Sequence, residues 1–259
     1  MKLHIVPART GVQWFKQGVR TFWKQPLALS GLFFMFMAAM SVFSMVPVIG
    51  NVLALAVLPG ATLGLMAATR EAANSKFPMP KVLFSGFSAG QQQLKAMLVL
   101  GVIYAVSFLL VLGISATIDG GKFAHLYLFG GEIKPETLQG AEFELAVLVA
   151  MALYMPLSLL FWHAPALVHW HGISPVKSLF FSMVACFRNF WAFTVYSLTW
   201  LGAFLAMGIV VAIVAGLTGS GELVSTLLFP GAMVLAAMYF TSIYFTFVDC
   251  FDESTGGAP

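Results

Sequence analysis

The chain has 259 residues, of which 60% are hydrophobic and 9% are charged, and its formal net charge is +3. An average soluble domain carries roughly 25% charged residues, so this composition excludes a water-soluble globule. Eleven of the thirteen Lys and Arg residues lie in three stretches, 1–25, 70–95 and 177–188, which alternate with long apolar segments. A bilayer admits only closed barrels or apolar helices of about 20 residues, and these segments are too long for barrel strands. We therefore predict an all-α polytopic membrane protein.

The first predicted element is an amphipathic helix that precedes the first span. Apolar residues recur at intervals of three and four between Val12 and Phe22, which marks one face of a helix. The opposite face repeats a cation every four residues: Lys16, Arg20 and Lys24. We expect this helix to lie on the inner leaflet, with Trp14 and Trp23 at headgroup depth. Its cations are candidate contacts for lipid headgroups or a partner protein, and simple anchoring of the chain end is the alternative.

Six apolar segments are long enough to cross the bilayer, and together they form one integral membrane domain over residues 1–259. The predicted spans are 27–46, 50–69, 94–118, 145–168, 190–217 and 223–248. The only charged residue within them is Lys95, one position from the end of its segment. Because inward-facing loops retain Lys and Arg, we expect both chain ends and the connections after the second and fourth spans to be cytoplasmic.

The long connection 119–144 is the predicted outer loop. It carries two Lys and five acidic residues, a net charge of 2 − 5 = −3, which is typical of a translocated segment. The positive charge of the whole chain is therefore not a sign of nucleic-acid binding. The cations are instead expected to meet anionic lipid headgroups of the inner leaflet.

Prolines recur in a pattern that predicts three similar units. One proline precedes each odd-numbered span, at Pro7, Pro80 and Pro175, and one lies inside each even-numbered span, at Pro59, Pro156 and Pro230. We interpret this as three hairpins of the same orientation, each preceded by a cytoplasmic-side amphipathic helix. The third of these helices carries Lys177 and Arg188, and the second is the weakest. Identity between the units is low, so chance placement of proline is the alternative.

The intramembrane prolines and one histidine are the candidate residues of a cavity. Pro59, Pro156 and Pro230 each free a carbonyl one turn back and kink the helix, which frames a shared cavity or simply curves the bundle. His163 is the main polar candidate inside a span. At 100° per residue, His163 and His169 point about 120° apart and His169 and His171 about 160° apart, so they cannot converge on a metal. We predict no metal site and an interfacial histidine belt instead.

Little in the sequence supports catalysis. No Ser-His-acid grouping, GxSxG, HExxH or phosphate-binding loop occurs, so we expect no catalytic residues and no cofactor. Cys186 and Cys250 fall on the cytoplasmic side, where thiols stay reduced, and no disulfide is expected. Asp249 is expected to form an ion pair with Arg70 or Arg188 at the inner surface.

A family resemblance follows from three segments. They are the opening from Met1 to Leu29, Leu58-Pro59-Gly60-Ala61 to Arg70, and the ending Val248-Asp249-Cys250-Phe251-Asp252. Across essentially the whole chain the sequence resembles an uncharacterised family of betaproteobacterial six-span inner-membrane proteins. More loosely, it is similar to the membrane domain of some glycerophosphodiester phosphodiesterases, whose separate catalytic barrel is absent here. The resemblance implies a location in the bacterial inner membrane and no reaction.

Two classes of function remain. The first is a non-enzymatic membrane component that binds anionic lipid, a partner membrane protein or a second copy of itself through its basic rim. The second is a permease for a small apolar or amphipathic solute. A hydrated path would draw on polar side chains within the spans: Thr62, Ser107, Tyr154, Ser158, His163, Ser197 and Thr241. An enzyme ranks third, because it would need His163, His169 or Asp249 beside another acid or nucleophile.

Overall fold

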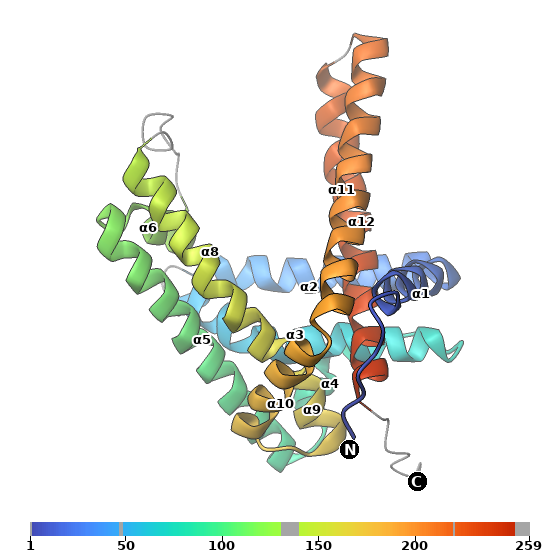
Figure 1. Cartoon of the computed structure of the whole chain (residues 1–259), viewed down its shortest axis with the longest axis vertical. Helices are drawn as coiled ribbons and strands as arrows, with labels where there is room; N and C mark the ends of the chain where they lie inside the picture. The colour runs from blue at the N-terminus through green and yellow to red at the C-terminus, as the bar shows by residue number, and fades with distance from the viewer. Residues whose placement is uncertain (1, 47–48, 131–139, 220, 252–259) are drawn as a thin grey trace. The chain divides into compact units, whose positions relative to one another are not determined.

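The computed structural model describes residues 2–46, 49–130, 140–219 and 221–251 (Figure 1). Over these residues every regular element is a helix, apart from an isolated antiparallel bridge between Leu3 and Phe251. Six of the described helices are long and apolar enough to cross a membrane, so the predicted all-α class with six spans is confirmed. They are α2 (Pro26–Ser44), α3 (Ile49–Ala73), α5 (Gln91–Asp119), α8 (Ala141–Phe161) with α9 (Ala164–His171), α11 (Phe190–Thr218) and α12 (Gly221–Cys250), whose spanning part is Thr226–Cys250.

The helices form two compact units. Unit 1 comprises Met1–Met35, Gly64–Leu83 and Ala185–Pro259, and unit 2 comprises Phe36–Leu63 and Phe84–Val184. The boundaries fall inside α2, α3 and α10 (Pro175–Arg188), so each of these helices contributes residues to both units.

Unit 1 is built around α1 (Thr10–Lys24), which packs against both α11 and α12. The buried face of α1 includes Gly11, Trp14 and Gly18. A side chain at Gly11 would meet the backbone oxygen of Ala192, and one at Gly18 would meet Ser242. Glycine is therefore needed at both positions to let the helices approach, which is how helices associate where lipid is as apolar as leucine.

Trp14 does not lie on the exposed face of α1, and its depth relative to a membrane stays a prediction. Trp14 is completely buried in unit 1, and its indole Nε1 donates a hydrogen bond to Asp249 Oδ2 at 2.8 Å. The ion pair expected between Asp249 and Arg70 or Arg188 stays a prediction. The sequence-based prediction used the spacing of the bulky apolar residues. The face of α1 that packs most closely is instead the one that carries Gly11 and Gly18. Trp23, by contrast, is 63% exposed.

Unit 2 contains α5 and α8, which pack side by side, and the short helix α6 (Lys122–Phe129), which contacts both (Figure 1). Helix α6 lies within the predicted outer loop 119–144, of which residues 131–139 fall outside the described part of the chain. Gly120 and Gly121, with φ of 69° and 87°, turn the chain between α5 and α6. The Asp119 carboxylate then accepts backbone N–H bonds from Gly121 and Phe123 at 2.9 and 2.7 Å, so it caps the start of α6.

The predicted fourth span, 145–168, is broken at Trp162 and His163. Pro165 has no N–H to donate to the carbonyl of Phe161, so the helix cannot continue through this point. Ser182 of α10 bonds the groups that the break frees. Its hydroxyl donates to the carbonyl of Leu159 at 2.7 Å and accepts from the backbone N–H of His163 at 2.9 Å. His163, the predicted intramembrane polar residue, is fully buried at this break.

The segments that precede the odd-numbered spans differ from one another. The first forms α1 and the third forms α10. The second is divided into a short 3-10 helix, Pro80–Phe84, and one turn of helix, Ser85–Ser88 (α4), and Gly90 with φ of 101° separates them from α5. This fits the sequence-based view of the second segment as the weakest. The grouping of the spans into three like-oriented hairpins stays a prediction.

Candidate functional site

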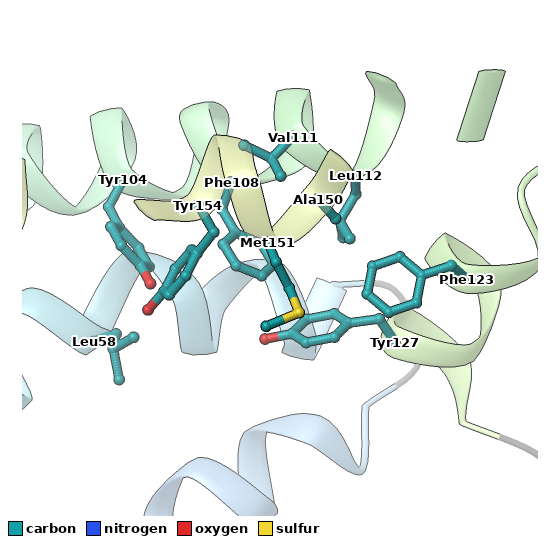
Figure 2. Close-up of a pocket in the computed structure, with 10 residues that line it drawn as sticks. All are labelled: Leu58, Tyr104, Phe108, Val111, Leu112, Phe123, Tyr127, Ala150, Met151 and Tyr154. Atoms are coloured by element: carbon teal, nitrogen blue, oxygen red, sulfur yellow. The ribbon is translucent and has the colours of Figure 1, made fainter. Parts of the chain in front are cut away.

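A cavity of 370 Å³ lies within unit 2. Ten side chains from α3, α5, α6 and α8 line it, and none of them is charged (Figure 2). They are Leu58, Tyr104, Phe108, Val111, Leu112, Phe123, Tyr127, Ala150, Met151 and Tyr154. The Asn51 side-chain amide donates a hydrogen bond to the backbone oxygen of Leu128, which links α3 to α6 beside the cavity.

Helical spacing places the aromatic lining residues on common faces. Tyr104 and Phe108 are four residues apart on α5, and Ala150 and Tyr154 have the same spacing on α8. The Phe108 ring is the centre of the aromatic cluster. Its centroid lies 5.0 Å from that of Tyr127, 5.8 Å from that of Tyr154 and 6.1 Å from that of Tyr104. These distances are those of favourable aromatic pairs.

Three phenol hydroxyls face one region of the cavity. Tyr104 and Tyr154 share a side-chain hydrogen bond, and Figure 2 shows the Tyr127 hydroxyl directed toward that pair. Burial raises the pKa of Tyr127, and the neighbouring Tyr154 raises it further. The Tyr127 phenol therefore stays protonated at neutral pH and remains a hydrogen-bond donor. The lining residues that the structure describes offer aromatic surface and hydroxyl groups, and none of these residues carries a carboxylate, imidazole, amine or thiol.

None of the three prolines predicted to kink the spans is among the residues that line this cavity. Pro59 is buried next to Leu58, whereas Pro156 is exposed on α8 two residues after Tyr154. Pro230 is exposed in unit 1. Sequence reasoning named Tyr154 as a candidate polar residue but missed Tyr104 and Tyr127. The spacing of Tyr104 and Phe108 was an available signal, and the helix that carries Tyr127 was not expected.

The second feature of note is a set of exposed cations in unit 1. Nine of the thirteen basic residues belong to this unit, and all nine side chains are exposed. They are Lys2, Arg9, Lys16, Arg20, Lys24, Arg70, Lys76, Lys81 and Arg188. Lys177, at the start of α10 in unit 2, is also exposed. All five of the predicted headgroup contacts are thus at the surface.

Hydrogen bonds join the chain segments that carry these cations. Lys24 Nζ donates to the backbone oxygen of Ala73 at 3.3 Å, so the end of α1 lies beside the end of α3. The side chain of the buried Asn189, which follows α10, binds the amino-terminal segment. Its Oδ1 accepts from the N–H of Val6 at 2.8 Å, and its Nδ2 donates to the His4 oxygen at 3.0 Å. The His4 N–H in turn donates to the Cys250 oxygen at 2.9 Å.

The two cysteines of unit 1, Cys186 and Cys250, are buried and form no disulfide with each other. Burial raises the pKa of Cys186 to about 12. At neutral pH this side chain is therefore almost entirely a thiol, a poor nucleophile. Within the described ranges no three His, Cys, Asp or Glu side chains are placed so that they could hold a metal ion.

Comparison with known proteins gives the chain a relative over its whole length. It is 40% identical over 262 residues to a Burkholderia thailandensis protein described as "Probable inner membrane protein", and the alignment covers 100% of this chain and 97% of the relative. No model of a known protein family and no solved structure matches the chain. The relative and the six apolar helices together identify a multi-pass protein of the inner membrane. The chain thus belongs to the family of bacterial inner-membrane proteins that includes this Burkholderia protein, as its sequence predicted.

Proposed function

We propose that the protein is a non-enzymatic component of the inner membrane that holds anionic lipid against the exposed cations of unit 1. The observation that carries this proposal is the imbalance of charge in that unit. By sequence, unit 1 holds nine Lys and Arg residues against five acidic residues, and the nine basic side chains are all exposed. One of the five acids, Asp249, is bonded to Trp14. Each Lys or Arg near an anionic membrane surface contributes about 1 kcal/mol of attraction.

Helix α1 holds part of this charge on a rigid support. Its glycine-bearing face is packed against α11 and α12, and Lys16, Arg20 and Lys24 project from the exposed remainder. Side chains on a fixed helix lose less conformational entropy on binding a headgroup than side chains on a flexible tail do. The three cations are therefore the best candidates for a specific contact with a phosphate group.

The bonds that join the chain segments support placing these cations on the cytoplasmic side. Asn189 holds the amino-terminal segment, and His4 of that segment bonds the end of α12, so residues 4–6, 189 and 250 lie together. Residues near the two ends of the described chain, 4–6 and 250, thus lie close together in unit 1, as an even number of crossings requires. Cytoplasmic placement of these residues follows the distribution of Lys and Arg along the chain.

Native mass spectrometry of the purified full-length protein tests the lipid contact. Replacement of Lys16, Arg20 and Lys24 together by Gln should lower the amount of retained anionic lipid several-fold. The matched control is the charge-preserving triple variant Lys16→Arg, Arg20→Lys and Lys24→Arg, which should retain most of the lipid. Unchanged lipid in the Gln variant, or an equal loss in both variants, would contradict the proposal. Loss of a co-purifying protein at constant lipid would assign the cations to partner binding instead.

A permease for a small apolar or amphipathic solute is the second candidate, and the uncharged cavity of unit 2 is the observation that favours it. Transport needs a path that opens to each side in turn, and the cavity supplies a binding site for such a path. Proteoliposome uptake that disappears when Ala150→Phe fills the cavity would favour this function. Uptake equal in that variant and the wild type would remove it.

A further inference from the structure

We propose that the cavity of unit 2 binds an uncharged, membrane-soluble molecule with a planar ring that bears carbonyl oxygens and an apolar tail. This site is independent of the headgroup contact proposed for unit 1. Quinone-type molecules are one example of the class. The proposal uses the charge, shape, hydroxyl groups and exposure of the lining residues.

The absence of charge in the lining selects an uncharged ligand. All ten lining side chains are neutral, so an ion in this space would lose its hydration with no opposite charge in the lining to pair with. Burial of an unpaired charge is among the most unfavourable changes in a protein. Phospholipid headgroups, which carry phosphate, are therefore poor occupants.

The shape and composition of the walls favour a ring. Five of the ten lining side chains are aromatic: Tyr104, Phe108, Phe123, Tyr127 and Tyr154. Phe108 lies within 6.1 Å of three tyrosine rings, so the space beside it is bounded by ring faces and edges from three helices. A planar ring can make offset or edge contacts with several of them at once. The volume of 370 Å³ falls in the range of about 300–1,000 Å³ of small-molecule sites.

The hydroxyl groups favour carbonyl oxygens on that ring. The hydrogen bond between Tyr104 and Tyr154 uses one of the protons of the three phenols and leaves two for a ligand. A phenol in apolar surroundings gains from an acceptor, and a carbonyl oxygen is an acceptor without charge. The hydrocarbon part of an acyl chain has no acceptor and would leave both donors unused.

The lining also reaches the lipid-facing surface, which leaves room for a tail. Met151 lines the cavity and is 64% exposed, and its neighbour Leu148 on α8 is 62% exposed. A ring bound beside Phe108 can therefore extend an apolar chain past Met151 along the outer face of α8. This exit allows a ligand much larger than the cavity itself.

Binding of decylubiquinone to the full-length protein in nanodiscs, measured by equilibrium dialysis, tests the proposal. We expect saturable binding to the wild type and at least tenfold weaker binding of decylbenzene, which has a ring and a tail but no carbonyl. Tyr127→Phe keeps the ring and leaves one phenol proton for a ligand instead of two. The double variant Tyr104→Phe and Tyr154→Phe also keeps the rings and leaves only the proton of Tyr127. Each should weaken quinone binding by roughly five- to tenfold, the effect of one hydrogen bond of about 1 kcal/mol.

Two further variants distinguish the cavity from the lipid-facing surface. Ala150→Phe should fill the cavity and abolish binding, whereas Leu148→Phe, on the exposed face of the same helix, should bind as the wild type does. No saturable quinone binding to the wild type would overturn the proposal. It would equally be overturned if both tyrosine variants bound decylubiquinone as the wild type does, because the phenol hydroxyls would then make no bond to the ring carbonyls. The tyrosine variants keep the test valid if Ala150→Phe fails to fold.

Discussion

In unit 1, helices α1, α11 and α12 approach so closely that a side chain cannot be accommodated at Gly11 or Gly18. Polar side chains inside unit 1 bond one another: Trp14 donates to Asp249, and the Tyr196 hydroxyl lies 2.6 Å from the Ser242 hydroxyl. In unit 2, helices α5, α6 and α8 leave a 370 Å³ cavity, and its hydroxyls are not all engaged with one another.

The difference shows how one apolar chain can combine rigidity with a binding site. Buried polar groups need partners, and the helices of unit 1 supply them for Asp249 and Tyr196. Unit 2 keeps bulky aromatic side chains around an incompletely filled space, which lowers packing density but provides room for a ligand. If this comparison is right, added side-chain volume should be harmful where α1 packs against α11 and α12 and tolerated in the wall of the unit 2 cavity.

The largest effect is expected from added volume in unit 1. Gly18→Ala places a methyl group against Ser242 and should lower the free energy of unfolding by about 3 kcal/mol. The measurement is chemical denaturation in mixed micelles, followed by circular dichroism. The matched control is Gly202→Ala on α11, where nothing lies within 4 Å of the added methyl group. Equal stability of the two variants would show that α1 does not pack as described.

A smaller loss is expected when the buried polar bond of unit 1 is broken. Trp14→Phe keeps most of the ring volume and removes the donor to Asp249, which should lower the free energy of unfolding by about 2 kcal/mol. Trp191→Phe, at a 70% exposed position, should change it by less than about 0.5 kcal/mol. The double variant Trp14→Phe and Asp249→Leu should regain part of the lost free energy of unfolding, because it leaves no buried carboxylate without its donor. Additive losses would argue against a direct bond.

The smallest effect is expected in unit 2. Ala150→Leu adds volume to the wall of the cavity and should raise the free energy of unfolding by about 0.5 kcal/mol, since cavity-filling changes commonly stabilise. The same denaturation experiment measures it, beside Leu148→Ala as a surface change on α8. A loss of 2 kcal/mol or more in Ala150→Leu would mean that the space is already filled by side chains, and the contrast between the units would fail.

The spans could be predicted from the sequence because a bilayer imposes their length and their apolar composition. The predicted fifth span, 190–217, corresponds to α11 at Phe190–Thr218, and the first, 27–46, to α2 at Pro26–Ser44. The break in the fourth span was not predicted, although Pro165 signalled it. A proline near the end of an apolar segment is compatible with a kink or a break, and the bridging hydroxyl of Ser182 lies nineteen residues beyond His163.

The sites were harder to predict because their residues come from distant parts of the chain. Trp14 and Asp249 are 235 positions apart, and neither lies in a recognisable motif. The cavity joins Leu58, Tyr104, Tyr127 and Tyr154 from four helices, one of which lies in a segment expected to be a loop. The cations named from the sequence are exposed, since charge is rarely buried without a partner, and their contact with headgroups stays a prediction.

The central claim is that Lys16 of unit 1 and Lys177 of unit 2 face the cytoplasm, whereas Lys122 in the outer loop faces the opposite side. Lys16→Cys, Lys177→Cys and Lys122→Cys, made singly, can be treated in intact cells with a membrane-impermeant maleimide. The native thiols give little background, because Cys186 and Cys250 are buried and the pKa of Cys186 is about 12. The account predicts labelling of Lys122→Cys in intact cells, and of Lys16→Cys and Lys177→Cys only after permeabilisation. Labelling of either of the latter two in intact cells would contradict it.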